Sequence, residues 1–388
     1  MAKPSLEKLL RVPASLRDSI SRTRAEYRNL GSSGLRVSSP ILGGLHLGSP
    51  KWFPWVLDEE QALPVLKAAY DRGINTWDTA NVYSNGQSER FIAKALRMYN
   101  IPRSKVILMT KCYRVVCDPE AFDPGSGVTM HHELADRSKD DVNQWGLSRQ
   151  AIFNAVEASL ERLNTSYIDV LQIHRFDHTV PPEETMSALH DLIRAGKVRY
   201  IGASSMWTYQ FATLQHIAET KGLTKFISMQ NHYNLIYREE EREMIQYCKI
   251  TGVGLIPVLI TSVQSESKRF LGLTLAWPHS GDRWHLADSH VAQGKILGLY
   301  ERLTAPMDPY RNTDMIIARI EEISQKRNWP MSHVSLAWLN RRVTAPIIRF
   351  SSVDRIEEAL AARGKELSED EERYLEELYV PQVVQGHS

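Results

Sequence analysis

The chain has 388 residues, which allows either two or three domains of average size or one large barrel. Its 47 Lys and Arg residues almost balance 46 Asp and Glu residues, so the formal net charge of +1 gives no global attraction to nucleic acid or to an anionic membrane. Hydrophobic residues make up 43% of the chain, and no apolar run approaches the roughly 18 residues of a membrane span. We therefore expect a globular protein without a nucleic-acid or membrane partner.

The first residues and the cysteines point to a reducing compartment. Residues 1–26 include Glu7 and Asp18 and lack the apolar core of a secretory signal, so we interpret them as an N-terminal extension. The three cysteines are too few and too scattered for a disulfide framework or a four-ligand zinc site: Cys112, Cys117 and Cys248. We expect a cytoplasmic protein.

Eight short apolar runs are predicted to be strands. In chain order they cover 39–44, 74–79, 106–111, 167–174, 198–204, 226–230, 253–260 and 345–350. Most of them do not alternate between apolar and polar residues, which is typical of parallel strands that are buried on both faces. Their number is the number that closes a β/α barrel.

Segments with helical periodicity separate these strands. Asp58 and Gln61 have the spacing of a capping box and begin a helix that ends at Gly73, although Pro64 inside it favours a kink. Ser148 begins a second helix, whose apolar residues recur every three or four positions. Further helices are predicted over 183–195, 208–221, 238–250, 313–327, 332–341 and 354–363, and from Ser368 to about Pro381.

This order of elements predicts a single-domain α/β protein, a (β/α)8 TIM barrel over residues 27–365. Insertions of irregular sequence interrupt it at about 114–147 and 261–297, and residues 366–388 form a C-terminal helix and tail. The alternative fold is an open, doubly wound sheet. No strand, however, is followed by a complete G-x-G-x-x-G turn, since GVGLIP at 252–257 lacks the third glycine.

The first insertion contains two adjacent histidines, His131 and His132. Because no carboxylate or cysteine stands at ligand spacing from them, we interpret them as solvated side chains and predict no metal site.

Four polar residues lie at or just after the ends of predicted strands, where a barrel of this type carries its functional face. They are Asp78, Tyr83, Lys111 and His174. Each alone has an ordinary structural explanation, but together they make a proton donor. A nearby ammonium on Lys111 would stabilise the phenolate of Tyr83, and Asp78 would keep that ammonium charged. His174 would donate a hydrogen bond to a substrate oxygen.

Several motifs resemble the aldo-keto reductase superfamily. They are WDTANVYSNGQSE at 77–89, TK at 110–111, LQIHRFD at 171–177, IGASS at 201–205 and SMQNHYN at 228–234. The resemblance covers roughly 27–257 and 298–365. It is strongest for the microbial branch that contains aryl-alcohol dehydrogenase-like proteins and versiconal hemiacetal acetate reductase. It implies the same (β/α)8 barrel that the strand count predicts.

The resemblance also implies a role for each of the four residues. Tyr83 would be the general acid, Lys111 and Asp78 would tune it, and His174 would orient the carbonyl group. Hydride would come from the reduced nicotinamide of NADPH, so the cofactor carries the difficult chemistry.

The same resemblance implies a dinucleotide site. Ser204, Ser205 and Gln230 match residues that hold the nicotinamide carboxamide, although many relatives have Asn in place of Ser205. At the other end, the matching residues are Arg349, Ser351, Arg355 and Glu358. Arg355 would bind the 2′-phosphate and Glu358 the adenine, which favours NADP over NAD. The alternative is that Arg355 and Glu358, three positions apart on a helix, form an ordinary solvated ion pair.

The chain departs from the family pattern after the seventh predicted strand. Relatives read IPWSPL there, whereas this chain reads IPVLIT, with Val258 in place of the aromatic residue that stacks on the nicotinamide. Residues 261–297 do not resemble the loop that covers the pyrophosphate. We therefore expect weaker cofactor binding, unless Trp277 substitutes for the missing ring.

The sequence thus predicts an NADPH-dependent reductase that converts an aldehyde or ketone to an alcohol, in secondary metabolism. Trp52, Phe53 and Trp55 favour an aromatic or polyketide-like substrate, although they would equally serve to pack their own loop. Two alternatives remain: a non-redox dehydratase, isomerase or cyclase on the same barrel, and a non-catalytic regulatory member that binds the cofactor. A metal-dependent hydrolase is set aside because only His174 and Asp78 stand where ligands would be needed.

Overall fold

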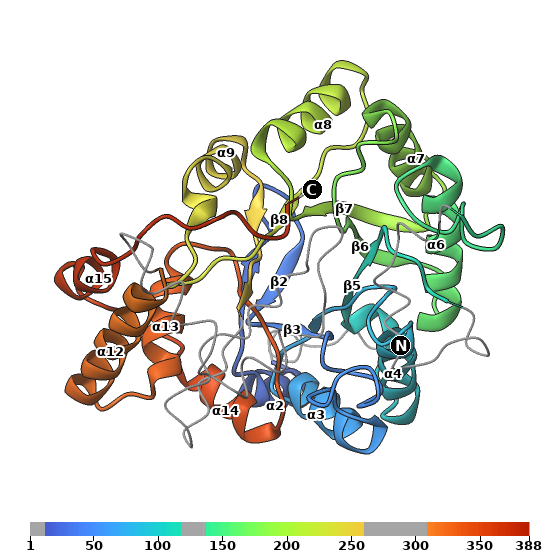
Figure 1. The fold of residues 1–388 in the computed structure, drawn as a ribbon. Coiled ribbons are helices and arrows are strands. Elements are labelled where there is room, and N and C mark those ends of the chain that lie inside the picture. The colour runs from blue at the N-terminus through green and yellow to red at the C-terminus, as the bar shows by residue number, and fades with distance from the viewer. Residues whose placement is uncertain (1–11, 118–134, 136, 260–308, 388) are drawn as a thin grey trace.

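The computed structural model describes residues 12–117, 135, 137–259 and 309–387. Their parallel strands form one curled sheet, and the helices surround it as an outer ring (Figure 1). The strands are β3 (Ile41–Gly43), β4 (Thr76–Asp78), β5 (Ile107–Cys112), β6 (Ile168–Ile173), β7 (Val198–Ser204), β8 (Ser228–Gln230), β9 (Gly254–Leu255), β10 (Val258–Leu259) and β11 (Ile347–Ile348). The predicted (β/α)8 barrel is confirmed.

One stretch of chain closes the sheet into a barrel. The strand order is β10-β11-β3-β4-β5-β6-β7-β8-β9, so that β9 and β10 stand at its two ends. Only Ile256 and Pro257 separate these two strands in the chain. The predicted strand 253–260 therefore pairs with β8 at its start and with β11 at its end, and it counts as one of eight strands around the barrel.

Successive side chains of each strand alternate between the barrel interior and the helices. The interior cluster contains Leu30, Val37, Ile41, Met109, Val170, Ile256, Ala345 and Ile347. The neighbouring residues Leu42, Leu108, Leu171, Met229 and Leu255 belong to the larger cluster between sheet and helices. Because Leu30 and Val37 come from an N-terminal hairpin, this hairpin closes one end of the barrel. It consists of β1 (Glu26–Asn29) and β2 (Arg36–Ser39).

The helices begin where the sequence places their caps. Asp58 accepts a hydrogen bond from the backbone of Gln61 at 3.1 Å, and Ser148 accepts one from the backbone of Ala151 at 3.2 Å. The helices around the barrel are α3 (Glu59–Asp71), α4 (Gln87–Met98), α6 (Arg149–Leu163), α7 (Pro182–Arg194), α8 (Thr208–Thr220), α9 (Met244–Thr251), α12 (Pro309–Arg327), α13 (Met331–Asn340), α14 (Val353–Ala361) and α15 (Glu369–Glu376). Helix α3 continues through Pro64.

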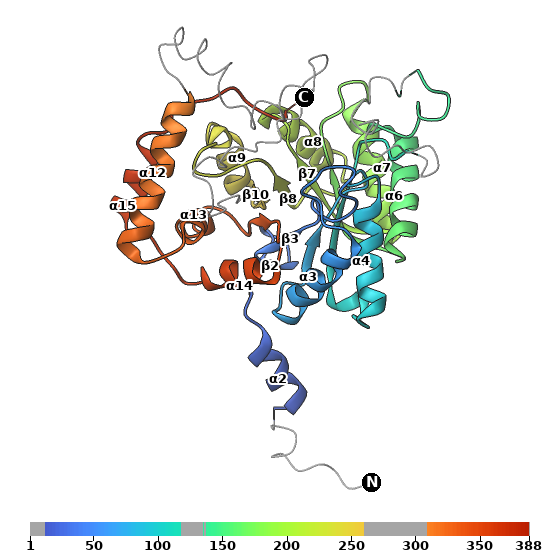
Figure 2. The same ribbon diagram turned by 60° about the horizontal axis from the view of Figure 1, so that its bottom comes forward.

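Some elements differ from the sequence-based prediction. Helix α4 and the β1–β2 hairpin were not predicted. The predicted helix 238–250 is instead a short 3-10 turn (Glu239–Glu241) followed by α9. Within the predicted extension, α2 (Ala14–Arg22) has no buried residue and projects away from the barrel (Figure 2).

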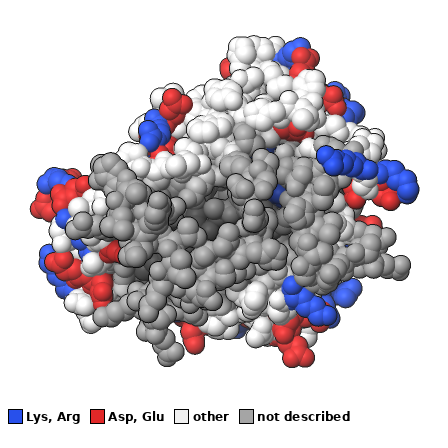
Figure 3. Space-filling model, in the orientation of Figure 1, with Lys and Arg blue, Asp and Glu red and all other residues white. Residues whose placement is uncertain are grey.

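The second insertion, at 261–297, lies entirely outside the described residues, and so do His131, His132 and Trp277. In the part of the chain that the structure describes, every helix is too short or too polar to cross a membrane. Positive and negative side chains are interspersed around the edge of the face shown in Figure 3. This mixture agrees with the net charge of +1.

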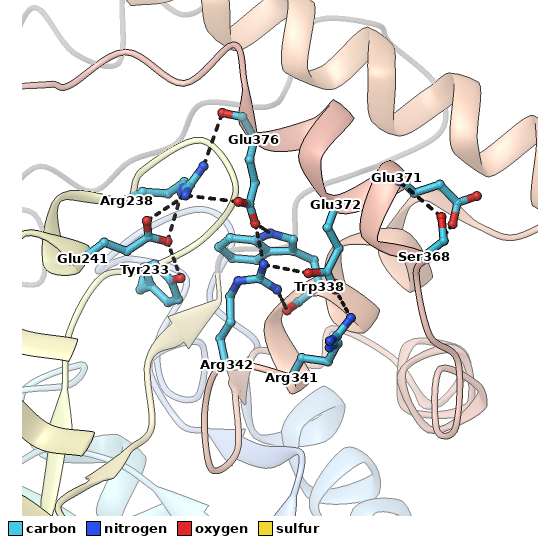
Figure 4. Close-up of polar contacts among 10 residues, drawn as sticks. All are labelled: Tyr233, Arg238, Glu241, Trp338, Arg341, Arg342, Ser368, Glu371, Glu372 and Glu376. Carbon is cyan, nitrogen blue, oxygen red and sulfur yellow. Dashed lines mark hydrogen bonds and ion pairs between the residues drawn. The ribbon is translucent and has the colours of Figure 1, made fainter. Parts of the chain in front are cut away.

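A charged cluster fixes α15 to the barrel (Figure 4). Glu376 accepts a hydrogen bond from the indole of Trp338 at 2.6 Å and forms an ion pair with Arg342. On its other side lies Arg238, which pairs with Glu241 at 2.7 Å and with Glu376 at 3.5 Å. The C-terminal helix is therefore held by contacts to α13 and to the loop after β8.

Candidate active site

A buried ion pair lies at the carboxyl ends of β4 and β5. Lys111 is fully buried, and its Nζ atom donates hydrogen bonds to Oδ2 of Asp78 at 2.6 Å and to the carbonyl oxygen of Thr79 at 2.8 Å. Asp78 ends β4 and Lys111 lies next to the end of β5, on adjacent strands. The structure thus brings together two of the predicted residues.

Two glutamines complete the hydrogen bonding of Asp78. Its Oδ1 atom accepts hydrogen bonds from Nε2 of Gln172 at 2.7 Å and from Nε2 of Gln230 at 3.0 Å. Lys111 and Gln172 are register partners across β5 and β6. The upper layer of the barrel interior is therefore polar, and each charge in it has a partner, as a buried charge requires.

The loop that carries Tyr83 has an unusual backbone. Ser84 and Asn85 adopt left-handed conformations with φ of 50° and 53°, and Gly86 follows with φ of 83°. Side-chain contacts stabilise this conformation, because Asn85 exchanges two hydrogen bonds with the backbone of Cys117, at 2.9 and 3.1 Å. A rigid loop is what a reactive side chain needs in order to hold one position.

Tyr83 lies among the other predicted catalytic residues. Nζ of Lys111 is 5.1 Å from the centre of the phenol ring, and the imidazole of His174 meets that ring edge-on at 5.9 Å between centroids. Tyr83 and His174 are only 6% and 5% exposed. Beyond Tyr83, the ring of Trp52 is 6.5 Å away. All four predicted side chains therefore converge at one end of the barrel.

The surroundings move the pKa values of the phenol and the amine. Burial raises the pKa of Tyr83 above its usual value, while the charge of Lys111 acts in the opposite direction. Burial alone would lower the pKa of Lys111, but the charges of Asp78 and Tyr83 outweigh it and raise that pKa. At neutral pH the phenol therefore keeps its proton and the amine stays charged.

His174 is neutral in this setting. Burial and then the charges of Arg175, Lys111 and Arg114 lower its pKa well below the ordinary value. Its Nδ1 atom is buried and has no hydrogen-bond partner among the described residues. A neutral imidazole with an unused ring nitrogen next to a phenol is suited to binding a carbonyl oxygen.

The predicted nicotinamide residues lie at the ends of β7 and β8. Ser204 donates a hydrogen bond to the carbonyl oxygen of Gln230 at 2.7 Å, and Ser205 adopts a left-handed φ of 46°. The backbone amide of Ser205 donates to Oδ1 of Asn231 at 2.9 Å, and the side chain of Asn231 in turn donates to Glu240. Strand β6 separates β7 and β8 from the Asp78–Lys111 pair, but the side chain of Gln230 reaches Asp78 across the barrel interior.

The C-terminal tail reaches the same region. His387 pairs with Oε1 of Glu240 at 2.8 Å, and its ring meets that of Trp207 at 4.9 Å. A Cβ atom added to Gly386 would lie 3.7 Å from Nη2 of Arg175. The last described residues therefore lie close to the predicted cofactor and catalytic residues.

The predicted phosphate end surrounds the start of α14. Ser352 caps this helix, and Arg355 donates to Glu358 at 2.7 Å, so the ordinary ion pair is present. Ser351 is exposed. The guanidinium of Arg349 lies over the ring of Trp55 at 4.7 Å, and burial lowers its pKa. The N-terminus of a helix with guanidinium groups nearby suits a phosphate, so this set fits the expected group.

Sequence reasoning missed three residues of the site. Gln172 lies on β6, two positions before His174, which directly follows that strand. Because side chains alternate along a strand, this spacing places both residues on the same face, which was a signal for Gln172. Arg175 belongs to the quoted LQIHRFD motif but was given no role. Asn231 belongs to the quoted SMQNHYN motif but was also given no role, because its partners Ser205 and Glu240 come from other segments of the chain.

Within residues 12–117, 135, 137–259 and 309–387, no group of three or more His, Cys, Asp or Glu side chains is arranged to hold a metal ion.

The chain is similar to a known family over most of its length. The model described as "Aldo/keto reductase family" matches residues 41–380. The chain is 75% identical over 388 residues to the aldo-keto reductase dtxS3 of Metarhizium robertsii. The aligned region covers 100% of both chains. It is 45% identical over 360 residues to the versiconal hemiacetal acetate reductase of Aspergillus parasiticus, covering 92% of this chain and 98% of the relative. The resemblance seen in the motifs is confirmed.

The fold is also similar to a solved structure. The thermostable aldo-keto reductase Tm1743, in complex with the inhibitor epalrestat, superimposes with a TM-score of 0.63 and 22% sequence identity. The match covers 91% of this chain and 99% of that one. At this identity the likeness concerns the barrel alone.

Proposed function

The chain belongs to the aldo/keto reductase family, and on this premise we propose that it reduces an aldehyde or ketone to an alcohol with NADPH, with Tyr83 as the proton donor. The single observation that carries the proposal is the convergence of Tyr83 with Lys111 and His174 in one buried cluster.

Each member of this cluster has a distinct task. Tyr83 is protonated at neutral pH and gives its proton to the substrate oxygen. The ammonium of Lys111 stabilises the phenolate that remains, and Asp78 holds that ammonium in place. The neutral imidazole of His174 donates a hydrogen bond that orients the carbonyl. The low exposure of these groups keeps bulk water away from the reacting atoms.

The cofactor would be held by two groups of residues, one at the ends of β7 and β8 and one at the start of α14. Ser204, Ser205 and Gln230 would bind the carboxamide, and Arg355, with the N-terminus of α14, would bind the 2′-phosphate. When bound, the reduced nicotinamide supplies a hydride to the carbonyl carbon. Arg349, Ser351 and Glu358 complete the proposed set.

The substrate is proposed to be aromatic or polyketide-like. Trp52 lies next to Tyr83, and the rings of Phe53 and Trp55 are stacked at 5.3 Å with an interplanar angle of 6°. These rings give the site an apolar wall that suits a flat substrate. The similarity to the versiconal hemiacetal acetate reductase of Aspergillus parasiticus supports a role in secondary metabolism.

The test is the oxidation of NADPH by the purified protein in the presence of 4-nitrobenzaldehyde. We expect turnover by the unmodified protein and a loss of about 10²- to 10⁴-fold in kcat for Tyr83→Phe, because the substitution removes the proton donor. Tyr209→Phe is the matched control, since Tyr209 lies on α8 and is 64% exposed. Equal activity of the two variants would contradict the assignment.

Binding of NADPH, followed by calorimetry, separates the two alternative functions. A non-redox enzyme on this barrel would act without binding NADPH, and a regulatory member would bind it without turnover. We expect both binding and turnover, with tighter binding of NADPH than of NADH.

A further inference from the structure

One buried cation of the site has no part in the proposed proton transfer. Arg175 directly follows His174 and is only 8% exposed. Its Nη1 atom donates a hydrogen bond to the carbonyl oxygen of His174 at 2.5 Å. Among the described residues, no carboxylate forms an ion pair with Arg175. This is unusual, because buried guanidinium groups in proteins are nearly always paired with an anion.

The surroundings of Arg175 add further positive charge. Burial first, and then the nearby charge of Arg114, lower the pKa of Arg175 to about 9. Arg114 is itself only 6% exposed, whereas the charge of Lys111 is paired with Asp78. The charges of Arg175 and Arg114 both act on His174, and an anion placed there would relieve the cost of burying Arg175.

The position of Arg175 defines where such an anion would lie. His174 and Arg175 are consecutive residues, and the hydrogen bond from Nη1 keeps the guanidinium close to the backbone of His174. The charge of Arg175 acts on both His174 and Tyr83, so a carbonyl held by these two residues lies near a cation. The ring of Trp52, 6.5 Å from that of Tyr83, provides an apolar wall. The site thus combines a cation with an aromatic ring.

We propose that Arg175 binds the carboxylate of the substrate, and that the substrate class is a 2-oxo acid with an apolar or aromatic side chain. This inference rests on the proposed reductase function. A planar guanidinium matches a carboxylate by two parallel hydrogen bonds, which fixes both the position and the orientation of the adjacent carbonyl.

Reduction of such a 2-oxo acid changes only its carbonyl group. The carbonyl carbon gains a hydride from NADPH, which becomes NADP+, and the C=O double bond becomes a single bond. The oxygen takes the phenolic proton of Tyr83, which solvent later replaces. The carboxylate is unchanged, and the product is a 2-hydroxy acid.

The first experiment compares substrates of the unmodified protein and needs no variant. Phenylpyruvate and its methyl ester differ in the carboxylate charge and by one methyl group, and 4-nitrobenzaldehyde reports the proposed reductase activity alone. We expect kcat/KM for phenylpyruvate to exceed that for the methyl ester by about 10- to 100-fold, as for a charge-assisted hydrogen bond. Equal values for the acid and the ester would overturn the inference.

The second experiment removes the cation. We expect Arg175→Met to lower kcat/KM for phenylpyruvate by about 10- to 100-fold more than kcat/KM for 4-nitrobenzaldehyde, and mainly through KM. Arg149→Met is the matched control, because Arg149 lies on the surface of α6, where it contacts the exposed Asp191 and the ring of Phe153. An equal loss for both substrates, or a rise in the KM for NADPH alone, would overturn the role of Arg175.

Binding separates the inference from the reductase proposal. Calorimetry with phenylpyruvate is carried out on the protein without cofactor, and we expect measurable heat that is lost in Arg175→Met. If no carbonyl compound is reduced but this difference persists, the reductase proposal fails and the anion site stands. If 4-nitrobenzaldehyde is reduced and phenylpyruvate binds both proteins equally, the anion site is wrong.

Discussion

The buried side chains at the barrel mouth have pKa values displaced in directions that fit their proposed tasks. The phenol of Tyr83 is shifted upward and the imidazole of His174 downward, so neither group titrates near neutral pH. Both shifts have burial as their largest cause, and the nearby charges adjust them. The proton donor and the oxygen-binding group are therefore fixed in the required protonation states over a broad range of pH.

The displaced pKa values predict a flat pH profile for reduction. Tyr83 has to carry its proton and His174 has to be neutral, so activity falls only above the raised pKa of the phenol or below the lowered pKa of the imidazole. We expect kcat/KM with 4-nitrobenzaldehyde to be constant between about pH 6 and 9. Steady-state rates across this range at constant ionic strength check it, and a break near pH 7 would contradict the assigned states.

Removing the ammonium should damage catalysis by raising the pKa of the phenol further. For Lys111→Met we expect kcat to fall by about 10²- to 10⁴-fold, because the phenolate left after proton transfer loses its counter-charge. Lys94→Met is the control, since Lys94 pairs with Glu59 on the surface. Circular dichroism of both variants confirms folding, and an active Lys111→Met protein would show that the amine does not act on Tyr83.

The sequence predicted the four clustered side chains because each belongs to a strand end or to a short motif. It did not reveal their supporting contacts. The hydrogen bond from Gln172 to Asp78 joins residues 94 positions apart, and Asn231 contacts Ser205 across 26 positions. Such contacts depend on how the strands are aligned, which residue types and spacing do not specify.

Helix α6 carries two ion pairs that differ in their environment. Near its end, Arg162 pairs with Glu89 of α4 at 2.6 Å, and these side chains are 8% and 0% exposed. At its start, Arg149 pairs with Asp191 of α7 at the same distance, but both side chains are about half exposed. Glu89 also accepts a hydrogen bond from Thr110 at 2.6 Å, so α4, α6 and β5 meet at one carboxylate.

The two pairs on α6 should contribute differently to stability. We expect Arg162→Met to lower the free energy of unfolding by about 3–5 kcal/mol, because Glu89 is left as an uncompensated buried charge. For Arg149→Met we expect a change of about 0–1 kcal/mol, since water screens an exposed pair. Urea denaturation measures both values, and similar costs for the two variants would contradict this explanation.

The same pair explains why α4 escaped prediction. Its inward side carries the charged Glu89 beside the apolar Ile92 and Leu96, which obscures the apolar periodicity. Its N-cap residue is Gly86, which has no side chain to cap the helix. The helices with a Ser or Asp cap, such as α3 and α6, were placed correctly. Helices with a Ser or Asp cap and an apolar face could be predicted from local sequence. Helix α4, whose inward face contains a charge paired with a distant residue, could not.

Segments far apart in the chain cooperate at the mouth of the barrel. The C-terminal His387 contacts Glu240, which is connected through Asn231 to the backbone of Ser205. The last residues of the chain are therefore linked by hydrogen bonds to the proposed cofactor site, although they belong to no strand of the barrel.

This connection predicts an effect of the tail on cofactor binding. For His387→Ala we expect the Kd for NADPH to rise about tenfold, because Glu240 loses a buried partner and no longer holds Asn231 in position. Gln150→Ala on α6 is the control, as it contacts only Asn154 of the same helix. Fluorescence titration gives both values, and equal affinities would show that the tail does not support Ser205.

The closure of the sheet by the segment from β9 to β10 has a consequence for self-association. Because this one stretch of chain occupies both ends of the strand order, the barrel sheet has no open backbone edge among the described residues that could template a strand from another molecule. Fibril-like aggregation through the barrel strands therefore requires that the ring first open between β8 and β11. Resistance to such aggregation should follow the stability of this short seam, rather than the net charge of the surface.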